Sequence, residues 1–314
     1  MSAVLDFLRT RTNVVLLILL ALFIAAIEII RPGTVNPLWA SNALLFAAPL
    51  AIFGAGQTLV MLTGGIDLSV AAVATGSAYL LATNASSGDA VAIGLALLLG
   101  LVVGIVNGVG VALLRVQPLV MTLGTSLMTG GIMIVYSQQM MASQPRVPEI
   151  IQFLGGGKVM DLVPVSLFIW IAVAALMIFG LNRTGFGRLL YAVGDNREAA
   201  QLAGVRVWRV LFVDYVLCAL LASLAGLVLV GVTNAADLSL ADGYLLPSVA
   251  CVVIGGTSIF GGRGGYSGTI IGALILTVLT SILTLTDVHE PVKQILYGVI
   301  ILALAGAYAR LTEA

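Results

Sequence analysis

The sequence predicts an all-α integral membrane protein, and three observations predict it. Of its 314 residues, 60% are hydrophobic and only 9% are charged, whereas a soluble domain carries about 25% charged residues. Apolar runs near the roughly 20 residues that a helix needs to cross a bilayer recur along the chain. Glycine-rich breaks interrupt these runs in both halves. So little polar surface cannot cover a globule in water, which excludes a soluble protein.

The apolar runs define about ten expected membrane helices. Their approximate bounds are 13–30, 43–62, 68–84, 91–114, 118–137, 161–181, 210–233, 244–260, 266–285 and 292–309. The first run follows arginines as a signal peptide does, but it lacks a small-residue cleavage site and is expected to be retained. All ten belong to one transmembrane domain, 1–314.

Ten helices place both chain ends on the same side, and the basic residues indicate which side. One side would carry ten arginines and the other only four basic residues. The ten are Arg9, Arg11, Arg115, Arg183, Arg188, Arg197, Arg206, Arg209, Arg263 and Arg310, and the four are Arg31, Arg146, Lys158 and Lys293. Because cytoplasmic loops are enriched in Lys and Arg, we expect both termini in the cytoplasm. The outer loop 138–160 contains prolines and glycines and is expected to be irregular, and 182–208 is the longest inner loop.

The stretch TGGIDLSV, 63–70, breaks the hydrocarbon between two apolar runs. Backbone groups inside a bilayer need partners, so this break must be buried in the bundle or line a watery path. Asp67 is placed to cap a helix that restarts at Leu68. It could equally line a substrate path, because intramembrane carboxylates are costly and often functional. Both interpretations stay open, and they are compatible.

The second half carries a similar break. FGGRGGYS, 260–267, separates two apolar runs and follows Gly255 and Gly256. Glycine-interrupted segments in corresponding places of two halves indicate the binding region of a transporter. The alternative is that these glycines only allow helices to pack closely.

Several polar residues lie within the apolar runs. An amide at Asn107 more often bridges helices than binds a solute, and the hydroxyls of MTLGTSLMTG, 121–130, usually bond to the preceding turn. Asp214 is expected near the interface, paired with Arg206 or Arg209. The residues expected to shape a translocation path are Gln57, Thr63, Gly64, Gly65, Asp67, Ser69, Asn107, Thr122, Thr125, Thr257 and Ser258.

The sequence offers no chemistry of its own. Cys218 and Cys251 lie in apolar runs and give neither a disulfide nor a metal framework. FLGGGKVM, 153–160, is not a phosphate-binding loop, because it lacks glycine at 152 and Ser or Thr at 159. We expect no catalytic residue, no metal, no cofactor and no nucleic-acid partner, so a pump would draw its energy from elsewhere.

The inner loop contains NREAAQLAG, 196–204. Good helix formers from Asn196 to Ala203 predict a short helix that Gly204 stops. Ala199, Ala200 and Ala203 give it a small, close-packing face. We favour a docking element over a solvated loop near lipid headgroups.

EAAQLAG resembles the EAA-x3-G signature of the permease subunits of bacterial ATP-binding-cassette (ABC) importers. Five further segments are similar to the ribose-type sugar permease branch, which includes ribose, galactofuranose and autoinducer-2 permeases. They are LVMLTGGIDLSV (59–70), NG (107–108), TLGT (122–125), GRLLYAVGDN (187–196) and IGGTSIFGGRGGYSGTIIGA (254–273). The resemblance runs from about residue 40 to 305, and Ala71 departs from the glycine usual after DLSV.

The resemblance implies alternating access driven by a partner ABC ATPase, which would hold the ATP and Mg. It implies a second permease copy or a paralogue, a periplasmic sugar-binding protein and multi-pass residence among the lipids of the bacterial inner membrane. Coupling to the ATPase would fall on residues of the inner loop. These are Gly187, Gly194, Asn196, Glu198, Ala199, Ala200 and Gly204.

Two other functions remain open. An ion-driven secondary transporter would need ionisable relay residues inside the bundle, and only Glu28, Asp67 and Asp214 offer themselves, all near span ends. An ABC permease could also carry a non-sugar solute such as a nucleoside, a vitamin, a branched-chain amino acid or autoinducer-2.

Overall fold

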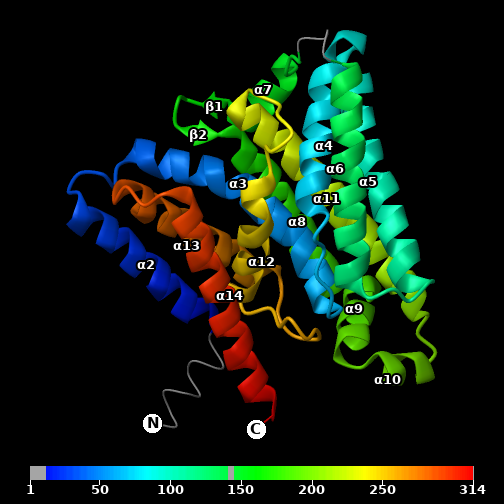
Figure 1. The fold of residues 1–314 in the computed structure, drawn as a ribbon. Coiled ribbons are helices and arrows are strands. Elements are labelled where there is room, and N and C mark those ends of the chain that lie inside the picture. Colours follow the sequence, from blue (N-terminus) through cyan, green and yellow to red (C-terminus); the bar gives the residue numbers. More distant parts are fainter. Residues whose placement is uncertain (1–11, 141–144, 314) are drawn as a thin grey trace, which may run out of the picture.

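A computed structural model describes residues 12–140 and 145–313, so Arg9 and Arg11 lie outside the described part. The described chain is mainly helical (Figure 1). Its α-helices are α2 (Thr12–Ile30), α3 (Pro37–Leu62), α4 (Val70–Thr83), α5 (Asp89–Ala112), α6 (Pro118–Gln139), α7 (Glu149–Gly156), α8 (Val165–Arg183), α9 (Gly185–Asp195), α10 (Arg197–Leu202), α11 (Val207–Thr233), α12 (Leu245–Ile254), α13 (Tyr266–Leu285) and α14 (Glu290–Glu313). Short 3-10 turns η1 (Ala85–Ser87) and η2 (Asp242–Tyr244) and an antiparallel pair, β1 (Lys158–Val159) and β2 (Val163–Pro164), complete it.

Each of the ten expected runs contains one helix, but two helices are shorter than expected. Among the described residues, seven helices are long and apolar enough to cross a membrane: α2, α3, α5, α6, α8, α11 and α13. The expected run 68–84 holds only the 14-residue α4, and 244–260 holds only the 10-residue α12. At 1.5 Å per residue these span about 21 and 15 Å, less than the roughly 30 Å of hydrocarbon. Both are short because the glycine breaks extend into the expected runs.

The centre of the bundle is built on α3 and α11. Helix α11 packs against α3, α4, α5 and α7, and α13 packs against α2, α3 and α12. Glycines allow the closest of these approaches: a Cβ at Gly226 of α11 would meet the backbone of Ala74 in α4. This is the close-packing role expected of small residues between membrane helices. Helix α6 turns large apolar side chains such as Leu127 outward.

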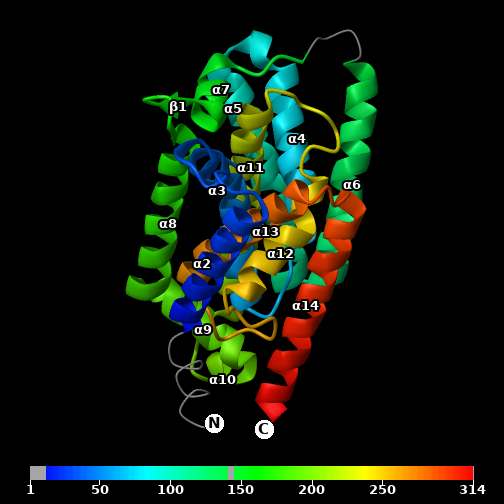
Figure 2. The same ribbon diagram turned by 90° about the vertical axis from the view of Figure 1, so that its left-hand side faces the viewer.

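The two ends of the bundle differ. Helices α9 and α10 lie at one end, and α7 with β1 and β2 lies at the opposite end (Figures 1 and 2). The first described turn of α2 and the last turn of α14 point toward the end that carries α10 (Figure 2). We refer to these as the α10 end and the α7 end.

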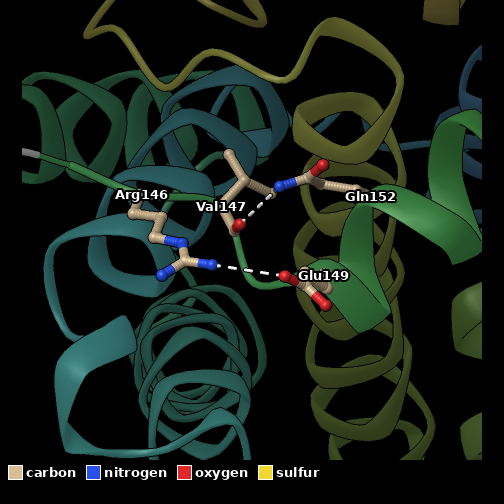
Figure 3. Close-up of polar contacts among 4 residues, drawn as sticks. All are labelled: Arg146, Val147, Glu149 and Gln152. Atoms are coloured by element: carbon tan, nitrogen blue, oxygen red, sulfur yellow. Dashed lines mark hydrogen bonds and ion pairs between the residues drawn. The ribbon is translucent and has the colours of Figure 1, made fainter.

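The loop 138–160 is more regular than its prolines and glycines predict. It contains α7. Two contacts join this helix to the residues just before it: Arg146 pairs with Glu149 at 3.3 Å, and Gln152 donates to the Val147 carbonyl at 2.8 Å (Figure 3). The helix forms because it has a surface to pack on: Gly155 lies directly against Gly231 of α11. The expectation of a wholly irregular loop was therefore wrong, and its residues 141–144 lie outside the described part.

Candidate functional site

The first break, between α3 and α4, is held by a glutamine side chain. Gln57 of α3 donates from Nε2 to the Asp67 carbonyl at 2.7 Å and accepts the Asp67 N–H on Oε1 at 3.2 Å. Gln57 and Asp67 are both fully buried. One amide thus satisfies both backbone groups of Asp67, which is what a broken helix inside hydrocarbon requires.

Asp67 is not the residue that caps α4. The helix begins at Val70 with Ser69 in the cap position, not at Leu68. Asp67 Oδ1 instead accepts the backbone N–H of Ser69 at 2.8 Å and its hydroxyl at 2.6 Å, closing the turn just before the helix. Its Oδ2 is buried and accepts no hydrogen bond from the described part of the chain. The prediction that Asp67 caps a helix was therefore wrong. Asp67 closes this turn instead, because the two residues after it are needed to redirect the chain before α4 begins.

Asn107 joins the break to two neighbouring helices. Its Nδ2 donates to the Ser69 hydroxyl at 2.9 Å, and its Oδ1 accepts the Thr125 hydroxyl at 2.7 Å. Thr122 accepts the Leu68 N–H at 3.0 Å and donates to the carbonyl of Pro118, one turn earlier. The helix-bridging interpretation of Asn107 is confirmed. We call the buried set Gln57, Asp67, Ser69, Asn107, Thr122 and Thr125 the polar centre.

The second break is closed by its own hydroxyls and meets the first break. Thr257 Oγ1 accepts the Gly265 N–H at 3.2 Å, and Ser258 Oγ accepts the Phe260 N–H at 3.2 Å. The Gly262 N–H donates to the Leu62 carbonyl at the end of α3, at 3.0 Å. Gly64, with φ +75°, would place a Cβ 3.2 Å from the Phe260 carbonyl oxygen. Glycine is needed there both for its left-handed backbone and for this approach.

Helices α9 and α10 contact both breaks. A Cβ at Gly194 of α9 would collide with the Leu62 carbonyl oxygen, so three backbone segments meet here without side chains. The Tyr191 hydroxyl donates to the Gly264 carbonyl at 2.9 Å, and burial raises the pKa of this phenol. Arg197, the first residue of α10, donates to the Thr63 carbonyl at 2.8 Å. The inner loop is therefore anchored directly to the broken helices.

Asp214 lies inside the bundle and not at the interface, where its charge predicts it. It is fully buried in α11 and accepts the Thr63 hydroxyl on Oδ2 at 2.9 Å, while Oδ1 has no hydrogen-bond partner among residues 12–140 and 145–313. The expected pairing with Arg206 or Arg209 is wrong; the Arg209 guanidinium lies 5.2 Å from the centroid of the Trp208 ring. The helix α11 begins at Val207, three residues earlier than the expected run, which carries Asp214 into the bundle.

The short helix of the inner loop forms as expected. Asn196 caps α10 by accepting the Ala199 N–H at 2.9 Å, and Gly204, with φ +83°, follows its C-terminal end. Ala200 is buried, while Ala199 and Ala203 are exposed. Leu202 is 90% exposed. Helix α9 was not predicted from the sequence. Its signals are the apolar residues Leu190 and Val193 on one helix face and Thr184 as an N-terminal cap.

A cavity of about 520 Å³ lies between α3, α12, α13 and α14. Its lining is aromatic, aliphatic and hydroxyl-bearing, and comprises Trp39, Asn42, Ala43, Phe46, Leu50, Gly243, Tyr244, Pro247, Leu276, Thr277, Thr280, Ser281, Thr284, Leu285 and Tyr297. None of the residues expected to shape a path is in this lining. The structure instead gathers Gln57, Asp67, Ser69, Asn107, Thr122 and Thr125 into the polar centre, and places Thr63, Gly64, Gly65, Thr257 and Ser258 in the two breaks. Apolar runs and glycine breaks gave no signal for this cavity.

A bundle of apolar helices, with two broken segments that meet beside an exposed short helix, defines a helical membrane transport protein. The family model described as branched-chain amino acid transport system / permease component matches residues 39–305. The chain belongs to this permease family, whose members are transport components rather than enzymes.

The chain is also similar to curated sugar permeases along most of its length. It is 37% identical to the ribose import permease protein of Escherichia coli strain K12 over 292 residues, which cover 91% of this chain and 90% of the relative. It is 35% identical to the ribose import permease protein of Bacillus subtilis, over 90% and 89% of the two chains. It is 33% identical to the fructose import permease protein of Rhizobium meliloti, over 94% and 85%. No solved structure matches the chain.

Proposed function

We propose that this chain is the membrane-spanning permease subunit of an ATP-driven importer for a small sugar. The observation that carries the proposal is its 33–37% identity to ribose and fructose import permeases over about nine-tenths of the chain. The chain would need no cofactor of its own, because ATP and Mg would be bound by a partner ABC ATPase. A periplasmic binding protein would deliver the sugar at the α7 end, and access would alternate between the two sides.

The topology proposed with this function has ten membrane helices and both termini in the cytoplasm of a bacterial inner-membrane protein. The arginine-rich loop 182–208 at the α10 end supports this orientation, because cytoplasmic loops collect positive charge. The first described turn of α2 and the last turn of α14 point the same way (Figure 2). The loop 138–160 would then face the periplasm, and lipid or a second permease copy or paralogue would cover the apolar face of α6.

Coupling to the ATPase is proposed to run through α10. Leu202 is exposed at the end of this helix, as is Glu198, and a docking helix needs such a surface. Gly194 and Arg197 tie the same loop to both breaks. Gly187, Asn196, Ala199, Ala200 and Gly204 would shape the loop. The proposed path residues, from Gln57 to Ser258, would then act by moving with the breaks.

A branched-chain amino acid is the second candidate substrate, because the matching family is described by that transport class. The experiment that tests both is purification of the chain from its native membrane, with identification of every co-purifying subunit and reconstitution into proteoliposomes. We expect an ATPase to co-purify and ATP-dependent uptake of radiolabelled D-ribose or D-fructose. Uptake of L-leucine instead would replace the substrate. Gradient-driven uptake by the chain alone would establish a secondary transporter and overturn the proposal.

A further inference from the structure

The cavity beside α13, which we call the α13 cavity, has the composition of a small-molecule site. Its volume of about 520 Å³ lies within the range of about 300–1,000 Å³ that is typical of ligand pockets. Such pockets combine apolar and aromatic walls with a few placed polar groups. Here Trp39, Phe46, Tyr244 and Tyr297 supply the aromatic walls.

The polar groups come mainly from one face of α13. Thr277, Thr280, Ser281 and Thr284 follow the three- and four-residue spacing of a helix face. Each hydroxyl donates to a carbonyl one turn earlier on α13. Because a hydroxyl oxygen has two acceptor sites, Thr277 and Ser281 keep acceptor capacity for a ligand, whereas Thr280 also meets Tyr297 and Thr284 also accepts Lys293. The face therefore suits a solute that brings its own hydroxyl donors.

A complementary donor lies across the cavity. Asn42 of α3 accepts Lys158 Nζ on Oδ1 at 3.0 Å, and its amide NH₂ supplies donors. The Tyr297 hydroxyl and the Thr280 hydroxyl lie 2.7 Å apart, so this pair fixes two walls together. Tyr244 is held by its ring contact with Phe53, 5.6 Å between centroids. Fixed walls reduce the loss of side-chain freedom when a ligand binds.

The charge of the lining separates the candidate substrates. Among the described residues, the lining holds no side chain that is charged at neutral pH. Two ammonium groups lie at its edge, each already bonded to a lining oxygen: Lys158 Nζ to Asn42 Oδ1 at 3.0 Å and Lys293 Nζ to Thr284 Oγ1 at 3.1 Å. A zwitterionic amino acid would need a partner for each charge, whereas a neutral polyol needs only donors, acceptors and flat apolar faces. The lining thus favours a neutral polyhydroxylated solute.

The position of the cavity also fits a transport path. The discontinuous helix α12 begins beside it, with Tyr244 at its cap position and Pro247 in its first turn. In transporters, discontinuous helices lie at substrate sites near the midplane. Through Lys158 of β1, the Asn42 side of the cavity reaches the α7 end (Figure 1).

We propose that the α13 cavity binds a neutral monosaccharide-sized polyol on its way from the α7 end, stacked between the aromatic walls and bonded to the hydroxyl face of α13. This inference rests on the proposed function and names a site for its substrate outside the two glycine breaks.

The test is protection of an introduced thiol. Ser281→Cys places a near-isosteric thiol in the cavity wall, and Thr286→Cys, on an exposed residue just after α13, is the matched control. The native Cys218 and Cys251 are fully buried. The full-length chain, purified with its co-purifying subunits in nanodiscs, is reacted with a small thiosulfonate with and without D-ribose. We expect D-ribose to slow the reaction about three- to tenfold at Ser281→Cys only, as blocking by a bound hydrogen-bonded solute predicts.

A second reporter and a transport assay keep the proposal falsifiable. Thr284→Cys, at the exposed mouth of the cavity, replaces Ser281→Cys if that variant does not accumulate. Uptake should fall about tenfold in Trp39→Ala and stay near normal in Trp39→Phe, because only the aromatic wall differs. ATP-driven D-ribose uptake without protection at either cysteine would overturn the site and leave the proposed function intact. The proposed site would also be overturned if lipid or L-leucine, but not D-ribose, protects the introduced cysteine.

Discussion

Two polar regions lie within this apolar bundle, and they differ in where their polar atoms point. In the polar centre, the side chains bond to one another and to the broken backbone, and Gln57 and Asn107 each make two such bonds. In the α13 cavity, the hydroxyls of α13 donate one turn back, and Thr277, Thr280, Ser281 and Thr284 line a space of about 520 Å³. The first arrangement holds a fold together and the second is open to a ligand.

This difference shows why intramembrane polarity alone does not identify a binding site. A polar side chain in hydrocarbon is retained either because it satisfies the backbone or because it meets a solute. Thr125 and Thr280 are the same residue type in similar helices, yet Thr125 donates to Asn107 whereas Thr280 lines the α13 cavity. Substitutions in the polar centre should therefore lower stability first, whereas those in the cavity should lower uptake at unchanged stability.

Gln57→Leu should give the largest effect. The substitution keeps the volume but leaves the buried N–H and C=O of Asp67 without their partner. Each unsatisfied buried group costs about 1–3 kcal/mol, so we expect the melting temperature of the purified chain to fall by roughly 5 °C or more. Gln152→Leu, at the surface of α7, is the control. If the melting temperature stays unchanged while uptake is lost, Gln57 acts on the ligand and not on stability. The proposed difference between the polar centre and the α13 cavity would then be wrong.

Gly194→Ala tests the junction where α9 meets both breaks. A methyl group there collides with the Leu62 carbonyl oxygen and the Gly262 N–H, and such overpacking costs about 1–3 kcal/mol. We expect a lower melting temperature and reduced uptake in reconstituted vesicles. Gly130→Ala on α6, where a Cβ meets open space, should leave both unchanged. If the two variants have the same melting temperature and uptake, α9 does not pack closely against the two breaks at Gly194.

Arg197→Ala sharpens the comparison by separating folding from coupling. It removes the donor to the Thr63 carbonyl at 2.8 Å and with it the charged link between α10 and the end of α3. Because bonds to charged groups are among the stronger ones, we expect uptake per ATP hydrolysed to fall roughly tenfold. Arg206→Ala, which removes an exposed arginine of the same loop, should retain the normal ratio. A normal ratio in Arg197→Ala would show that this link carries no coupling.

Tyr191→Phe should give the smallest effect. It removes one neutral, exposed bond to the Gly264 carbonyl, worth about 0.5 kcal/mol at the lower end of the range for such bonds, so we expect uptake to fall about twofold. Burial raises the pKa of the Tyr191 phenol, so the group stays protonated and continues to donate as the pH rises through neutral values. The ratio of variant to native uptake should therefore be constant between about pH 6 and 8. A ratio that changes in this window would indicate another titrating group.

The sequence predicts the helices better than the site. Each of the ten apolar runs contains a helix, Asn196 and Gly204 delimit α10, and Asn107 bridges helices as its amide predicts. The helix bounds at α4 and α12 were wrong, because apolar composition continues into the turns of the breaks. Asp214 was predicted to lie at the interface but is buried inside the bundle. The charge of a residue does not show where its helix begins.

The α13 cavity was not predictable by the same reasoning. Its lining joins α3, near the start of the chain, to the distant segment 243–297, which contains α12, α13 and part of α14. Its hydroxyls, such as Thr277 and Ser281, have the spacing of any threonine-rich helix face. Only the packing of α3, α12 and α14 around α13 shows that these hydroxyls face a space and not a neighbouring helix.

The two short helices also constrain how the chain enters its membrane during synthesis. With 14 and 10 residues, α4 and α12 are too short to be recognised singly as they emerge from the insertion machinery. Each follows or precedes a long helix across a glycine break, α3 before α4 and α13 after α12. Each pair would therefore leave the insertion channel as one unit, with its break already closed by partners such as Gln57. We therefore expect biogenesis of this chain to proceed in steps larger than single helices.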